Sequence, residues 1–131
     1  MKPILRDLSL ALVKFHRGLL LFQAELAEKQ DGRKYPPYEL LNLSLNDPRF
    51  MWLRQFSELI IQIDTIVDDK KNTPFDASAI NAAVKNLVRL DAEHSHGLLG
   101  AIKADSSIML PLGELRKAML ALETAIASQL Q

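Results

Sequence analysis

The residues with the clearest chemical potential lie in the segment 89–96, which reads RLDAEHSH. Asp91 stands three residues before His94, and residues at this spacing face each other on a helix. A carboxylate followed three residues later by His is half of the pattern of di-iron bundles, which take one such motif from each of two helices. No second predicted helix of this sequence carries the motif, so the sequence predicts neither a metal site nor a cofactor.

Arg89 and His94 also have the spacing of a known catalytic pair. The pattern Arg-x4-His resembles that of the HEPN ribonucleases, which are small helical bundles, and Arg89 to His96 fits a wider form of it. The resemblance implies that His94 is a general base and that Arg89 stabilises phosphate charge on an RNA substrate. Such a loose spacing arises easily by chance, so a ribonuclease is an alternative and not the main hypothesis.

A second group of polar residues lies on the segment 46–69, NDPRFMWLRQFSELIIQIDTIVDD. Its main apolar stripe is predicted to face a core, which leaves one mixed flank as a candidate binding surface. His16 is a further candidate on the edge of the first helix's apolar stripe, near Ser9 and Gln23; capping of a backbone group is its favoured role and a pocket the alternative. The flank residues are Phe50, Arg54, Ser57, Ile61 and Asp64.

Apolar residues three and four apart predict four long amphipathic helices that position these groups. The first runs from about residue 3 to 30 and stops at Gly32. The second begins behind Asp47 as N-cap. The third begins behind Asp76, extends towards His94, and is expected to end, bend or fray between Gly97 and Gly100. The fourth runs from about 107 or 111 to 129, and a short helix is expected at 39–45, after two prolines.

These elements predict an all-α fold, an up-and-down four-helix bundle with a short additional helix between the first two long ones. The chain has 131 residues, of which 48% are hydrophobic, and this is enough for one core. A single helical-bundle domain is therefore expected over residues 1–131.

The composition argues against several classes of protein. Sixteen basic and sixteen acidic residues cancel, so DNA binding is not expected. Because there is no cysteine, the chain has no disulfide framework and no thiolate zinc site. Charges interrupt the apolar N-terminal run before it reaches the roughly 18 residues of a membrane span, so a cytoplasmic protein without membrane segments is expected.

Two runs of the sequence resemble a family of small bacterial all-helical proteins of uncharacterised function. They are FHRGLLLFQAEL at 15–26 and ELLNLSLNDPRFMWLRQFSELIIQID at 39–64, about half of the chain. The resemblance implies a helical fold and no particular activity. The shared pattern, DPxFxWLRxxSxxIxxID, falls on Asp47, Pro48, Phe50, Trp52, Leu53, Arg54, Ser57, Ile60, Ile63 and Asp64.

No group of catalytic residues exceeds what chance would place together. The sequence therefore favours a non-enzymatic interaction or regulatory module with a protein partner; the alternatives are a HEPN-like ribonuclease and a small-ligand or metal-binding bundle. Self-association is also expected, because several apolar residues lie off the main stripes, unless the short helix covers them. These residues are Leu10, Val13, Leu20 and Leu21 on the first helix and Phe50 and Ile61 on the second.

Overall fold

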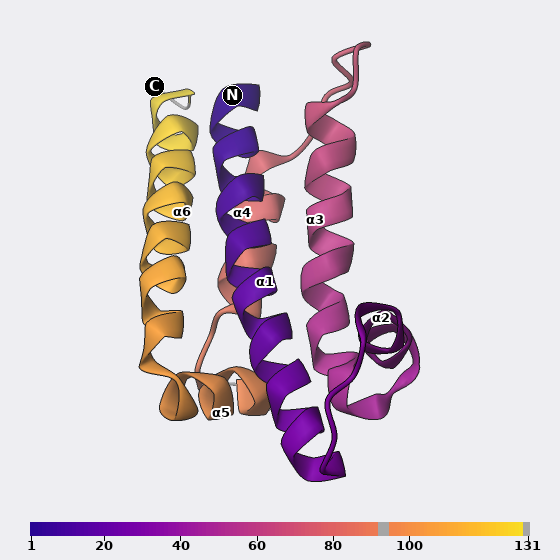
Figure 1. Cartoon of the computed structure of the whole chain (residues 1–131). Helices are drawn as coiled ribbons and strands as arrows, with labels where there is room; N and C mark the ends of the chain where they lie inside the picture. The colour runs from indigo at the N-terminus through magenta and orange to yellow at the C-terminus, as the bar shows by residue number, and fades with distance from the viewer. Residues whose placement is uncertain (92–94, 130–131) are drawn as a thin grey trace.

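The computed structural model describes residues 1–91 and 95–129, and within them every regular element is a helix (Figure 1). The prediction of an all-α fold is therefore confirmed. None of the described helices combines the length and the apolar character that a membrane crossing requires. The α-helices are α1 (Lys2–Asp31), α2 (Pro37–Asn46), α3 (Arg54–Val67), α4 (Ala77–Leu87), α5 (His96–Ala104) and α6 (Met109–Gln129), and the short 3-10 helices η1 (Pro48–Leu53) and η3 (Ser106–Ile108) precede α3 and α6.

Four of these helices surround the core. α1 lies between α3 and α6, and α4 packs against both α3 and α6. In Figure 1, α1 and α4 run downwards while α3 and α6 run upwards, so each helix is antiparallel to its packed neighbours. The core is built on α1, whose inner stripe has no exposed surface and consists of Leu5, Leu8, Leu12, Phe15 and Leu19.

The predicted helix ends are confirmed at three positions. Gly32 follows α1 in the left-handed conformation, with φ of 67°, which costs a glycine little because it lacks a Cβ. The Asp47 carboxylate accepts a hydrogen bond from the backbone N–H of Arg49 at 2.9 Å, and Asp76 caps the start of α4 in the same manner. Local side-chain chemistry therefore sets where these helices begin and end.

The second long helix begins differently from the prediction. Its first six residues, Pro48–Leu53, form the 3-10 helix η1, and the α-helix starts only at Arg54. Side chains three apart eclipse each other in a 3-10 helix, and here Phe50 and Leu53 both point into the core. Phe50 is 1% exposed, so its assignment to an exposed flank is wrong.

The predicted third long helix is divided in two. α4 ends at Leu87, and α5 lies across the lower end of the molecule (Figure 1). Gly97 on α5 lies directly against the indole of Trp52. A Cβ at this position would be only 2.4 Å from the ring carbon Cδ2. The prediction of one helix continuing towards His94 is therefore wrong at Leu87, and His94 itself lies outside the described residues.

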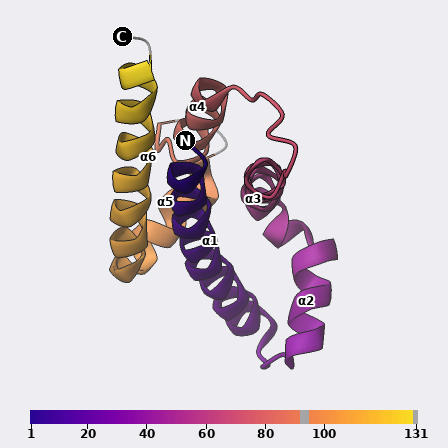
Figure 2. The same ribbon diagram turned by 90° about the horizontal axis from the view of Figure 1, so that it is seen from above.

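α2 lies outside the ring of four helices. Figures 1 and 2 show it running crosswise near the lower ends of α1 and α3, and it packs against η1. Leu40 and Leu43 on its inner side are partly buried against the core, but none of its residues is fully buried. The apolar outer side of α1 stays uncovered, since Leu10 is 56% and Leu21 is 59% exposed.

Candidate functional site

Three polar contacts join α1 to the segment formed by η1 and α3. On α1 the three residues are seven apart, which is about two helical turns, so they lie along one side of the helix. α3 is antiparallel to α1, and its residue numbers therefore fall as those of α1 rise. The pairs of this α1–α3 polar seam are Ser9 with Asp64, His16 with Ser57, and Gln23 with Trp52.

The two outer pairs of the seam satisfy buried polar groups. Ser9 and Gln23 are 4% and 6% exposed, and buried side chains of this kind need hydrogen-bond partners. The Ser9 hydroxyl donates to Asp64 Oδ1 at 2.5 Å, and the indole N–H of Trp52 donates to Gln23 Oε1 at 3.0 Å. Both contacts therefore fix the register of α1 against η1 and α3.

The central pair of the seam is His16 with Ser57. His16 Nε2 lies 3.3 Å from Ser57 Oγ, and the imidazole stacks on the ring of Phe56 with 6.2 Å between centroids. Burial lowers the pKa of His16 below its ordinary value, so the imidazole is neutral near pH 7. The expected capping of a backbone group is replaced by a contact with a side chain.

A hydrogen-bonded Ser and His form the first half of a nucleophilic site. Catalysis also requires a group that orients the imidazole and donors that stabilise an oxyanion. Asp64, the acid of the seam, is seven residues from Ser57 on α3, about 10 Å along the helix, and binds Ser9 instead. The contacts of the seam therefore hold the two helices together, and its acid is not placed to orient His16 as in a hydrolase.

The other candidates on the second helix lie apart from the seam. Arg54 donates to the backbone carbonyl of Leu45, which ties the start of α3 to α2. Ile61 is 65% exposed on the outer side of α3. The structure therefore brings His16, Ser57 and Asp64 onto one interface and leaves Arg54 and Ile61 outside it.

Arg89 and Asp91 follow the end of α4 and bind each other. Arg89 Nε lies 3.1 Å from Asp91 Oδ1, and this hydrogen bond raises the pKa of Arg89 and lowers that of Asp91. Neither residue is in a helix, so the helical spacing that suggested a pair with His94 does not apply to them. Within the described ranges, no three His, Asp or Glu side chains are grouped to hold a metal ion.

α2 presents an apolar stripe to solvent that the sequence reasoning did not select. Tyr38, Leu41 and Leu45 are 72%, 62% and 58% exposed. Their spacing of three and four places them on one side of the helix, opposite Leu40 and Leu43. This stripe is called the α2 outer face below, and its spacing was the signal that could have revealed it.

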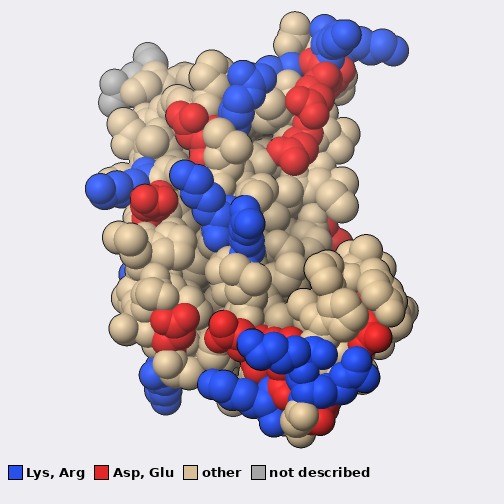
Figure 3. Space-filling model, in the orientation of Figure 1, with Lys and Arg blue, Asp and Glu red and all other residues tan. Residues whose placement is uncertain are grey.

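The segment that carries α2 is fixed at both ends by Arg49. Its Nη2 lies 3.0 Å from Asp31, the last residue of α1, and 2.8 Å from Asp47, which follows α2. Hydrogen bonds to Arg49 lower the pKa of both carboxyls, and the hydroxyl of Tyr35 donates to Asp31 at 2.5 Å. Figure 3 shows basic and acidic side chains crowded together at the lower end of the molecule, below a largely uncharged surface at the lower right.

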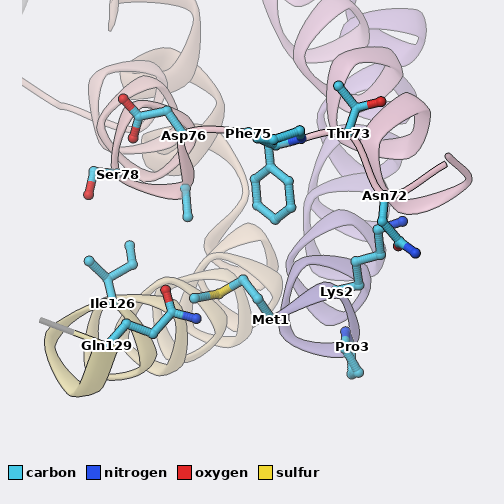
Figure 4. Close-up of a pocket in the computed structure, with 12 residues that line it drawn as sticks. Met1, Lys2, Pro3, Asn72, Thr73, Phe75, Asp76, Ser78, Ile126 and Gln129 are labelled. Carbon is cyan, nitrogen blue, oxygen red and sulfur yellow. The ribbon is translucent and has the colours of Figure 1, made fainter.

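A hollow of about 800 Å³ lies at the opposite end of the molecule. In Figure 4 the ring of Phe75 points into it towards Met1, and Ile126 lies to one side of Met1, so part of its lining is apolar. Specific small-molecule sites add a few fixed polar groups to such walls. The lining of this hollow includes Asn72, Ser78 and Gln129, and Lys2 at its rim donates to the carbonyl of Asp69 at 2.5 Å.

The chain was also compared with known proteins. No family model, no curated protein and no solved structure matches it.

Proposed function

We propose that the protein is a non-enzymatic interaction module that self-associates through the α2 outer face. One observation carries the proposal: α2 buries none of its residues fully, yet the segment that carries it is held at both ends by specific polar contacts. An isolated helix of ten residues is only marginally stable in water. The contacts that fix α2 hold three large apolar side chains towards solvent. This arrangement is expected of a surface that binds another protein chain.

A second copy of the chain is the partner that best fits this face. A two-fold contact joins a surface to itself, so the surface must be self-complementary. The only charged residue of α2 is Glu39, which is paired with Arg33 at 2.9 Å. Two antiparallel α2 helices would place Leu41 against Leu41 and Tyr38 near Leu45 of the second copy, without like charges in contact.

The contact is expected to be weak. Specific interfaces bury about 1,200–2,000 Å² in total, and a pair of ten-residue helices is at or below the lower limit. A concentration-dependent dimer, with dissociation in the micromolar range or above, is therefore the expected state.

Light scattering from micromolar to millimolar concentration tests this proposal. The mass should rise above 14.7 kDa with concentration, and Leu41→Glu should abolish the rise. Leu120→Glu on α6 is the matched control, because both leucines are 62% exposed. A constant monomer mass, or an equal effect of the two substitutions with helicity intact by circular dichroism, would refute self-association through α2.

We also infer that α1, α3, α4 and α6 constitute an up-and-down four-helix bundle. The alternating directions of these helices and their contacts support this assignment. We also propose that the chain belongs to the family of small bacterial helical proteins that its sequence resembles. Five of its signature positions carry structural contacts, namely Asp47, Trp52, Arg54, Ser57 and Asp64.

A further inference from the structure

The geometry points to a second interface: we propose that the outer face of α1 binds an acidic amphipathic helix of another protein. This proposal is independent of self-association through α2. The apolar members of the face are Leu10, Val13 and Leu21, which are 56%, 40% and 59% exposed. Three exposed cations lie among them, and together these six residues are called the α1 outer face: Arg6, Leu10, Val13, Lys14, Arg17 and Leu21.

The α1 outer face is a second stripe on a helix that already supplies the core. Its spacing of three and four runs parallel to the buried stripe of α1 but on the opposite side of the helix. α3 and α6 occupy the flanks of α1, and α4 lies behind it (Figures 1 and 2). Within residues 1–91 and 95–129, no helix therefore covers this stripe.

The cations of the α1 outer face belong to those of the described chain that form no ion pair, as Lys103 and Arg116 also do. Arg33, Arg49, Lys85 and Arg89 each form an ion pair with an Asp or Glu. Arg6, Lys14 and Arg17 form none with the acids of residues 1–91 and 95–129. Figure 3 shows Lys and Arg side chains gathered over the middle of α1, with Asp and Glu side chains above them and to their left.

These unpaired cations decide which partner fits. Charged interfaces are arranged so that positive groups meet negative ones, so the partner should present carboxylates between apolar residues. A second copy would enclose the cations of both chains in one contact, which is unfavourable. An acidic amphipathic helix places Leu-type and Glu-type side chains at the same three-and-four spacing and matches both properties of the face.

An anionic lipid surface shares part of this chemistry but fits less well. Interfacial helices bury a broad apolar face in the membrane. The broad apolar face of α1 is already inside the protein, and only three apolar side chains remain outside. The protein partner is therefore favoured, and lipid binding is an outcome of the test.

The probe is a fluorescent peptide of about 18 residues, long enough to span the face at 1.5 Å per residue. It carries Leu at three-and-four spacing and Glu elsewhere; one control peptide has Lys in place of Glu, and another has the acidic sequence scrambled. Anisotropy is measured with the full chain, in parallel with vesicles of phosphatidylcholine and phosphatidylserine in equal parts. The acidic helix should bind saturably, and added salt should weaken it.

Arg17→Glu should weaken binding of the acidic peptide about tenfold or more. Arg116→Glu, which makes the same charge change on the exposed side of α6, should alter it less than about twofold. Leu41→Glu should leave it unchanged, which separates this interface from that of α2. Equal binding of the Lys or scrambled peptide, absence of saturable binding, equal effects of the two arginine substitutions, or binding to vesicles alone would overturn the proposal.

Discussion

Gly97 and Gly100 lie in the same helix, and replacing each with alanine is expected to change stability in opposite directions. A Cβ at Gly97 would lie 2.4, 2.7 and 2.8 Å from three ring carbons of Trp52, whereas a Cβ at Gly100 meets no atom within 4 Å. Carbon atoms normally stay about 3.5 Å apart, so Gly97→Ala must displace α5 or the indole by about 1 Å.

The magnitudes follow from these contacts. Overpacking of this kind costs about 1–3 kcal/mol, and a displaced indole also weakens its hydrogen bond to Gln23, worth about 1 kcal/mol. Alanine regains about 1 kcal/mol of helix propensity at either position. Gly97→Ala should therefore destabilise the protein by about 1–3 kcal/mol, and Gly100→Ala should stabilise it by up to about 1 kcal/mol.

Urea unfolding followed by the fluorescence of the single tryptophan measures both effects. The midpoint should fall for Gly97→Ala and rise for Gly100→Ala, with similar slopes. If both substitutions raised the midpoint equally, the close contact between α5 and the indole would be refuted.

Two further predictions concern the α1–α3 polar seam. Gln23→Ala leaves the indole N–H of Trp52 without its acceptor, so it should lower the free energy of unfolding by about 1–3 kcal/mol. The control Gln62→Ala, on the exposed side of α3, should change it by less than about 0.5 kcal/mol. Equal losses in urea unfolding would contradict a hydrogen bond between Gln23 and Trp52. Burial lowers the pKa of His16 in the folded protein, so as the pH falls His16 is protonated in the unfolded chain before it is protonated in the folded one. The contribution of His16 to the free energy of unfolding should therefore be complete above pH 6.5 and should decline as the pH falls towards the lowered pKa of the folded state. His16→Gln should flatten this decline in unfolding curves taken between pH 7 and 5, and an unchanged slope would count against a buried neutral imidazole.

The helices and their caps were predictable because their signals are local. Asp47, Asp76 and Gly32 act on their own backbone neighbours, and heptad stripes record which side of a helix is buried. The division between α4 and α5 was not predictable in this way. It coincides with the packing of Gly97 on Trp52, a contact between residues 45 positions apart in the sequence.

The candidate site was half predictable for a related reason. Ser57 and Asp64 were selected as binding residues, and His16 was placed near Ser9 and Gln23, because all of them stand beside apolar stripes. Their seven-residue spacing indicates which side of each helix they occupy but not the register of one helix against the other. In the structure they are partners of each other, so residues that looked available for a ligand are engaged inside the fold.

This engagement of the seam changes where a function must be sought. If the polar residues between α1 and α3 hold the two helices in register, the outward groups on α1 and α2 are among those left without a partner in the described chain. The α2 outer face carries no unpaired charge and suits a copy of itself, whereas the α1 outer face carries unpaired cations and suits an acidic partner. Because α1 supplies both the core stripe and the seam, a substitution on its inner side would alter stability and binding together. Only substitutions on the outward sides, such as Leu41→Glu and Arg17→Glu, can separate binding from folding.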